Sequence, residues 1–171
     1  MKKNRVSIIV AMDEKRGIGK DGNLLFKISE DFQRMNSLTR GHPLVMGRRT
    51  FFSIGRVLRN GRTTIVVTRD PQRVKDINFY SPEVKIASSL TEGIRQAKQS
   101  PGSEETFIFG GGEIFKEALE KDIVDKLYLT KVEGDFQADT FFPDYSQFKK
   151  AIFEKVGQEG RYKYKFIDLE K

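Results

Sequence analysis

The sequence predicts one α/β domain with a mainly parallel central β-sheet, helices on both faces and an antiparallel C-terminal edge. Short apolar or β-branched runs alternate with stretches of helical spacing through most of the 171 residues, which is typical of parallel strands joined by helices. The end of the chain differs, because residues 126–134 and 161–170 alternate apolar with polar side chains. That alternation predicts half-buried antiparallel strands.

The first half of the chain begins with a buried strand at residues 6–12. A loop follows at 16–24, where the sequence has three glycines and an Asp-Gly pair. We expect a helix at 29–38, because Ser29 can cap it and acidic residues in its first turn suit the helix dipole. The next elements are a strand at 43–47, a helix at 48–55 that ends at Gly55, and a β-branched strand at 63–68.

The second half continues the alternation. A strand at 84–87 precedes a helix within 88–99, whose start has a capping box formed by Ser89 and Glu92. A strand at 106–110 then leads into a helix at 113–121. The two alternating segments described above close the chain.

The composition limits the classes of function. A chain of 171 residues with 37% hydrophobic and 32% charged residues can bury one core, so we expect one domain over residues 1–171. The apolar run that starts at Val6 meets acid at Asp13, which is too short for a membrane span and a poor secretory signal. We therefore expect a cytoplasmic protein without a membrane partner. The absence of cysteine and the single histidine, His42, exclude thiolate zinc sites and multi-histidine metal centres, so we expect no metal.

The net charge of +7 favours an anionic partner, either nucleic acid or a small phosphorylated molecule. The basic residues are spread along the chain, so a merely basic surface fits the composition equally well. Aromatic residues are not interleaved with the basic ones as stacking platforms for bases would require. We therefore expect no nucleic acid partner.

Two strand-to-helix turns have features of phosphate-binding sites. Three consecutive glycines, 110–112, follow the expected strand, where bare backbone N–H groups and the helix dipole can approach an anion. Segment 46–50 has the same layout and adds two arginines and a threonine. A tight turn and a solvated basic helix start explain the same residues, so these motifs alone leave both interpretations open.

Two side chains suit polar groups of a ligand. Asp31, beside Phe32, could accept two parallel hydrogen bonds from the amidine-like edge of a 2-aminopyrimidine ring. Arg62 could clamp a carboxylate by a fork of two bonds. Dipole stabilisation on a wet surface explains Asp31 as well, and an exposed arginine that opens a strand explains Arg62.

Together, these motifs resemble the dihydrofolate reductase family nearly end to end. The matching segments, in the family's order, are 6–24, 29–32, 43–56, 61–69, 107–115, 127–144 and the closing aromatic strand. The resemblance implies the family's fold and the NADPH-dependent reduction of 7,8-dihydrofolate to 5,6,7,8-tetrahydrofolate. Hydride would go to C6 and a proton to N5. It also implies a monomer.

The resemblance implies specific substrate-side roles. Asp31 would hold the 2-amino and N3 edge of the pterin and help to deliver the proton, with its carboxylate supported by Thr130. Arg62 would clamp the α-carboxylate of the substrate's glutamate, and Phe26 would belong to the catalytic group. The other implied substrate contacts are Ile9, Val10, Phe32, Met35, Ile54 and Phe109.

For the cofactor, the resemblance implies a mobile loop at residues 13–27 that closes over the nicotinamide. It also implies a cis peptide between Gly110 and Gly111, and an adenosine-binding subdomain at about 42–100. Thr68 and Arg69 would meet the adenosine 2′-phosphate. The full set of implied NADPH contacts is Ala11, Ile18, Gly19, Asn23, Leu24, Gly47, Arg48, Arg49, Thr50, Thr68, Arg69, Phe109, Gly111, Gly112, Glu113, Ile114 and Phe115.

The chain departs from the family pattern around the expected pterin and nicotinamide sites. Residues 24–26 are Leu-Leu-Phe where the family usually has Leu-Pro-Trp, and a further proline is absent from the segment at Ser29. Phe115 replaces the common tyrosine, and Phe109 is bulkier than the usual isoleucine or valine. These changes leave two alternatives open: a related NADPH-dependent reductase of another pteridine or a ribosylaminopyrimidine, and a non-catalytic nucleotide-binding homologue.

Overall fold

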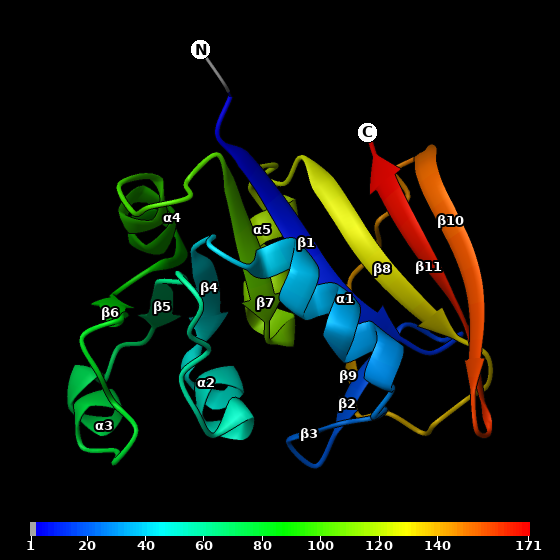
Figure 1. Cartoon of the computed structure of the whole chain (residues 1–171), viewed down its shortest axis with the longest axis horizontal. Helices are drawn as coiled ribbons and strands as arrows, with labels where there is room; N and C mark the ends of the chain where they lie inside the picture. The colour runs from blue at the N-terminus through cyan, green and yellow to red at the C-terminus, as the bar shows by residue number, and fades with distance from the viewer. Residues whose placement is uncertain (1–2) are drawn as a thin grey trace.

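An eight-stranded sheet forms the centre of the structure, a computed structural model that describes residues 3–171. Its strands, in chain order, are β1 (Arg5–Met12), β4 (Leu44–Gly47), β5 (Thr64–Val67), β6 (Val84–Ala87), β7 (Glu105–Gly110), β8 (Lys126–Val132), β10 (Lys150–Glu159) and β11 (Tyr162–Glu170). Their order across the sheet is β10-β11-β8-β1-β7-β4-β5-β6 (Figure 1).

Most neighbouring strands of this sheet are parallel. β1 lies between β7 and β8 and runs parallel to both, and β4, β5 and β6 continue the parallel sheet beyond β7. β11 runs opposite to the other strands of the sheet and pairs antiparallel with both β8 and β10. The expected mainly parallel sheet with an antiparallel C-terminal edge is confirmed.

Three details at the sheet edges and in a connection differ from the sequence-based expectation. The segment 126–134 was expected to be a half-buried antiparallel strand, but β8 is parallel to β1 and buried at every residue except Lys131. A strand paired on both sides inside an α/β sheet is covered by other elements on both faces. β10 was not predicted, because its first seven residues are all exposed and its sequence does not alternate. The short helix α3 (Pro71–Lys75) was also missed.

Helices cover both faces of the sheet. The other helices are α1 (Ser29–Thr39), α2 (Arg48–Ile54), α4 (Leu90–Lys98) and α5 (Gly112–Glu120). One core cluster joins α4 and α5 to residues such as Ile8 and Val45, and a second joins α2, α3 and the end of α1 to residues such as Leu44 and Phe107. Figure 1 shows α1 lying across the near face of the sheet and α5 behind it.

A second, small sheet forms where a loop was expected. β2 (Gly17–Lys20) pairs with β3 (Asn23–Leu24) and, on its other side, with β9 (Thr140–Phe141). The expectation of a loop over 16–24 is therefore wrong for these residues. The partner strand β9 is more than a hundred residues away in the chain, so no local pattern could reveal the pairing.

The helix caps divide between confirmed and wrong expectations. Gly55 ends α2 with a φ of 70°, as expected. Ser89 caps α4 by accepting the amide N–H of Glu92 at 3.1 Å, but the Glu92 carboxylate accepts from Ser88 and not from Ser89. Ser29 is not a cap: α1 begins at that residue, and its amide donates to the Glu159 carboxylate at 3.0 Å.

Within residues 3–171, no helix is long and apolar enough to cross a bilayer. The same part of the chain has no group of three or more histidine, cysteine, aspartate or glutamate residues placed to hold a metal ion.

Candidate active site

The carboxyl ends of the central strands meet at a point where the strand order reverses. From β1 the chain moves outward through β4, β5 and β6 and then returns to insert β7 between β1 and β4. Ligands of open α/β sheets bind at such a point, outside the carboxyl ends of the strands. The small β2–β3–β9 sheet lies at this end of the central sheet, beside one end of α1 (Figure 1).

A carboxyl group and a hydroxyl group face each other at this edge. Asp31 lies in the first turn of α1, and Thr130 is a buried residue of β8. The Thr130 hydroxyl Oγ1 donates to Asp31 Oδ1 at 2.5 Å. Burial raises the pKa of Asp31 above its ordinary value of 3.8, and the Thr130 hydrogen bond and the charge of Arg34 oppose that rise. Asp31 therefore retains a proton to higher pH than an exposed aspartate does.

The side of α1 next to Asp31 presents apolar surface that the protein does not cover. Phe32 is 38% exposed and Met35 is partly exposed, while Thr39 alone is fully buried in this helix. The sheet adds the half-buried side chains of Ile9 and Phe109, and the end of α2 adds that of Ile54. Together they offer apolar contacts for a flat ring whose polar edge meets Asp31.

Arg62 is buried and not an exposed residue that opens a strand. Its side chain is fixed by Nε donating to Thr39 Oγ1 at 3.1 Å, Nη1 to the Arg59 carbonyl at 2.7 Å and Nη2 to the Asn36 carbonyl at 2.9 Å. Burial lowers the pKa of its guanidinium, and the nearby charge of Arg40 adds to this effect. Arg62 thus brings a fixed positive charge to the far end of α1.

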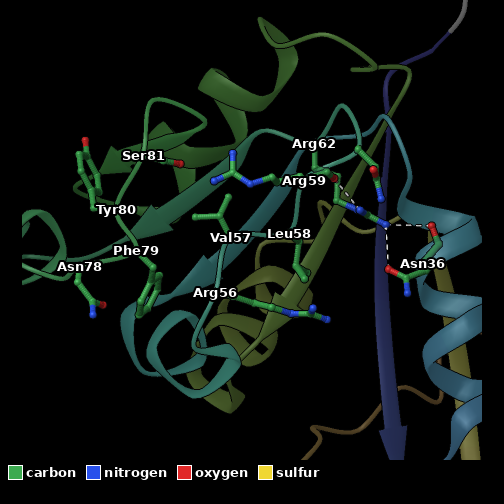
Figure 2. A pocket seen from close by; sticks show the side chains of 11 residues that line it. Asn36, Arg56, Val57, Leu58, Arg59, Arg62, Asn78, Phe79, Tyr80 and Ser81 are labelled. Carbon is green, nitrogen blue, oxygen red and sulfur yellow. Dashed lines mark hydrogen bonds between the residues drawn. The ribbon is translucent and has the colours of Figure 1, made fainter.

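A pocket of about 590 Å³ opens beside Arg62, between the end of α1 and segments 56–62 and 78–81 (Figure 2). Figure 2 shows the Arg62 side chain reaching toward Asn36 on α1. Arg56 and Arg59 also line the pocket. The arginines make it suitable for an anionic group.

The two glycine turns lie side by side. Gly47 and Gly111 are the N-caps of α2 and α5, and neither helix has a side-chain cap. A Cβ at Gly47 would lie 3.5 Å from Ile114 Cγ1 and 3.8 Å from the amide nitrogen of Gly111, and a Cβ at Gly111 would lie 3.5 Å from Thr50 Oγ1. Two helix N-termini with uncapped amides therefore share one surface, a setting that favours phosphate groups.

The peptide bond between Gly110 and Gly111 is cis, as the family resemblance implied. Gly110 has a φ of 111°, and a Cβ there would lie 2.9 Å from the ring of Phe115. Position 110 therefore accepts only glycine without local rearrangement. Phe115 is itself 2% exposed and packs edge-on against Phe142 at 5.1 Å.

The expected adenosine side lies after β5. Thr68 Oγ1 accepts the amide N–H of Asp70 at 3.0 Å, and the Asp70 carboxylate lies 3.9 Å from the guanidinium of Arg48. Arg69, which stands between Thr68 and Asp70 in the sequence, is exposed, and so is Arg49 on the first turn of α2. Residues 42–100 contain β4, β5, β6 and the helices between them.

The segment 13–27 is tied to a second loop by two carboxylates that the sequence analysis missed. Asp13, 1% exposed, accepts the amides of Lys15 at 2.9 Å and Gly17 at 2.7 Å with one oxygen and of Phe136 at 3.0 Å with the other. Asp139 accepts the amide of Asp21 at 2.9 Å and donates its own to the Gly19 carbonyl. The available signal was an acidic residue at the carboxyl end of a buried strand.

Other predicted site residues have varied surroundings. In the segment 13–27, Ile18 and Gly19 lie on β2, and Asn23 and the 65% exposed Leu24 lie on β3. Ala11 is paired with Thr130 across β1 and β8, and the exposed Glu113 follows Gly112 on α5.

Two residues of the predicted site have side chains packed into hydrophobic clusters of the protein. The side chain of Val10 contacts the core cluster formed with α4 and α5. Phe26 is 7% exposed and packs edge-on against Phe136 at 4.8 Å and Tyr162 at 6.0 Å. Packing explains Phe26 fully in this structure, and its catalytic role stays a prediction.

Known proteins are similar to this chain in sequence and in fold. A family model described as dihydrofolate reductase matches residues 5–171. The dihydrofolate reductase of Staphylococcus haemolyticus is 38% identical over 153 residues, or 88% of this chain and 85% of that protein. Dihydrofolate reductase type 3 of Salmonella typhimurium is 39% identical over 140 residues, or 82% of this chain and 79% of that protein.

A solved structure agrees with these matches. Dihydrofolate reductase from Enterococcus faecalis, complexed with NADP(H) and RAB-propyl, has a TM-score of 0.81 and 30% sequence identity, with 98% of this chain and 96% of that chain covered. The match of sequence and fold over nearly the whole length shows that the chain belongs to the dihydrofolate reductase family.

Proposed function

We propose how the crevice beside Asp31 carries out the reaction of this family, the NADPH-dependent reduction of 7,8-dihydrofolate to 5,6,7,8-tetrahydrofolate. The chain is an oxidoreductase with NADPH as its cofactor, so the non-catalytic alternative is set aside. The observation that carries the proposal is the half-buried Asp31 carboxyl, held by Thr130 beside uncovered apolar surface of α1.

The substrate is placed by three kinds of contact. The Asp31 carboxyl accepts hydrogen bonds from the 2-amino and N3 edge of the pterin, and Phe32 and Met35 pack against the ring from α1. The acidic end of the substrate lies toward the pocket beside Arg62, where three arginines favour a carboxylate. The neutral hydrogen-bond partners of Arg62 leave its positive charge uncompensated there.

The residues present fit NADPH. The uncapped N-termini of α2 and α5 suit its pyrophosphate, with Arg48 and Thr50 beside them. Thr68 and Arg69 suit the 2′-phosphate, so we propose that residues 42–100 bind the adenosine half. When bound, NADPH supplies the hydride that reduces C6 of the substrate.

Asp31 serves the proton side of the reaction. Because burial raises its pKa, a larger fraction of the carboxyl is protonated at a given pH than for an exposed aspartate. Thr130 holds Oδ1 in place, and both carboxyl oxygens keep lone pairs for the two donors of the pterin edge. The β2–β3 segment, anchored by Asp13 and Asp139, excludes water from this side.

Asp31→Asn tests the assignment. The variant keeps the shape of the side chain but removes the titrating group, so turnover of dihydrofolate should fall by about 10²–10⁴-fold. The affinity for NADPH, measured by fluorescence titration, should stay nearly unchanged. Asp76→Asn, at the exposed residue that follows α3, is the matched control and should retain wild-type turnover. Full activity of Asp31→Asn would exclude the assignment.

We further propose a monomer in the cytoplasm that acts on this small molecule without a nucleic acid or membrane partner. Charged side chains along the edge strand β10, among them Lys150, Glu154 and Lys155, disfavour edge-to-edge pairing of two sheets. Light scattering at the working concentration checks the mass, and fractionation of cells checks the location. A mass equal to that of a dimer would refute the proposed monomer, and recovery of the protein with membranes would refute the proposed cytoplasmic location.

A further inference from the structure

α1 carries a second partly buried charge, which the proposed reaction does not use. The side chain of Arg34 is 16% exposed, and its guanidinium contacts the Asp168 carboxylate of β11. Its central carbon lies 4.8 Å from the ring centroid of Phe166 and 5.4 Å from that of Phe153. Lys126 Nζ lies 3.8 Å from the other oxygen of Asp168. The three charges Arg34, Asp168 and Lys126, hereafter the cation cluster, carry one net positive charge.

The cation cluster lies close to the Asp31 carboxyl. Arg34 follows Asp31 by three residues, so the two side chains are neighbours on the surface of one helix. Phe166, which packs against the Arg34 guanidinium, is paired across β11 and β8 with Thr130. Thr130 in turn donates to Asp31. One continuous set of contacts therefore links the positive charge to the carboxyl.

Of the other charged groups near Asp31, one of two carboxylates is paired with a lysine, and the other accepts from a backbone amide. Glu30 accepts from Lys155 Nζ at 2.8 Å and from the Tyr164 hydroxyl at 2.7 Å. The neighbouring Glu159 carboxylate accepts from the amide of Ser29. Arg34 is the charged group that acts on the Asp31 carboxyl. The elements that pack next to it add Glu30 on α1, Lys126 and Tyr128 on β8, Lys155 and Glu159 on β10, and Tyr164 and Asp168 on β11. The cation cluster supplies the excess positive charge on the β8 and β11 side.

We propose that Arg34 is a positioning residue that sets the pH range in which Asp31 carries its proton, with Asp168 holding the guanidinium one helical turn from the carboxyl. The inference rests on the proposed function of Asp31. The positive charge stabilises the ionised carboxylate and so offsets part of the effect of burial. The direction agrees with the pKa of Asp31, which burial raises and the charge of Arg34 lowers. A carboxyl balanced in this way can both release and regain a proton during turnover.

Two substitutions should shift the pKa of Asp31 in opposite directions. Arg34→Met keeps an apolar stem over the aromatic rings but removes the charge, so the pKa of Asp31 should rise and the falling limb of kcat/KM should move to higher pH. Asp168→Asn leaves two positive charges without their partner, so the limb should move to lower pH. Arg34→Lys keeps the charge and should stay close to the wild-type profile.

Lys163→Met, which removes one positive charge from an exposed position on β11, is the matched control and should not move the profile. The same variants are titrated by carbon NMR at the Asp31 carboxyl, a readout that does not depend on turnover. Thermal unfolding checks that each variant folds. If Arg34→Met does not fold, the shift in Asp168→Asn still decides the test.

The possible results separate the two proposals. Opposite shifts in the pH profile and in the NMR midpoint support the role of Arg34. If the wild type is active but Arg34→Met, Asp168→Asn and Lys163→Met all keep the wild-type NMR midpoint, the role of Arg34 is overturned. The proposed reaction then still stands. A wild type that does not oxidise NADPH with dihydrofolate overturns the proposed function, while the NMR midpoints still decide the role of Arg34.

Discussion

At the scale of single residues, opposing forces act on Asp31. Removal from water favours the protonated carboxyl, whereas the Thr130 hydroxyl and the Arg34 charge favour the ionised one. The result is a carboxyl whose pKa lies above the ordinary value and which is held in one orientation. This combination suits the proton-donating role that we propose for Asp31.

The same balance predicts an effect of pH on stability. Because the pKa of Asp31 is higher in the folded than in the unfolded chain, its ionisation favours unfolding. This loss of stability is absent well below pH 3.8 and grows as the pH rises through the pKa of Asp31 in the folded protein. Asp31→Asn should therefore raise the free energy of unfolding at neutral pH, and the gain should shrink toward pH 3. Urea unfolding at both pH values measures it. A variant that is less stable than wild type at neutral pH would contradict the account.

The residue types alone predicted some of these candidate roles. Others involve residues that are far apart in the sequence, so no local pattern could predict them. Asp31 was a candidate from its chemistry, but Thr130 lies 99 residues away, so family resemblance and not local pattern joined them. The burial of Arg62 was not predicted, because its partners Asn36 and Thr39 come from a different element. Arg34 has an ordinary place in a helix pattern, and only the fold shows that it lies over aromatic rings.

At the scale of elements, the closing segment of the site depends on one tight approach. A Cβ at Gly17 on β2 would lie 2.5 Å from the Ala138 Cβ and 2.8 Å from Asp13 Oδ2. β2 and the 133–139 loop therefore contact each other without a side chain between them. Because Asp13 binds both segments, they form one unit, the one that we propose excludes water from the reaction.

Gly17→Ala should push this unit apart. Misplacement of a covering segment by about 1 Å can cost roughly 10²-fold, and we expect kcat/KM for dihydrofolate to fall by about 10–100-fold. Thermal stability should change less, because β2 lies outside the central sheet. Ala138→Gly removes the clashing methyl group and should restore part of the activity when combined with Gly17→Ala. Wild-type kinetics in Gly17→Ala would show that the close contact between Gly17 and Ala138 is not needed for activity.

Element prediction succeeded where periodicity is strong and local. The parallel strands β1, β4, β5, β6 and β7 and the four longer helices follow from apolar runs and helical spacing, whereas β8 was predicted as a strand of the wrong direction. β2, β3 and β9 are two to four residues long and held by pairing with distant chain, which composition does not encode. β10 failed for a different reason, since an exposed edge strand needs no buried face.

At the scale of the whole molecule, the net charge of +7 acts on a cofactor with several phosphates. The arginines at the candidate cofactor site, Arg48, Arg49 and Arg69, are partly or fully exposed, so added salt should screen them. The dissociation constant of NADPH should rise several-fold from low to physiological ionic strength, measured by fluorescence titration. NADH, which lacks the 2′-phosphate, should show a weaker dependence. Equal salt dependence for both cofactors would argue against a phosphate contact at Arg69.

In the proposed reaction, the Asp31 carboxyl and the reduced nicotinamide meet at the same pterin ring. A crystal structure of the protein with NADP⁺ and folate would show whether they do. We expect the 2-amino and N3 edge on the Asp31 carboxyl, the pyrophosphate on the N-termini of α2 and α5, and the nicotinamide against the pterin. A pterin bound away from Asp31, or a nicotinamide that does not reach the pterin, would refute the proposed reaction geometry.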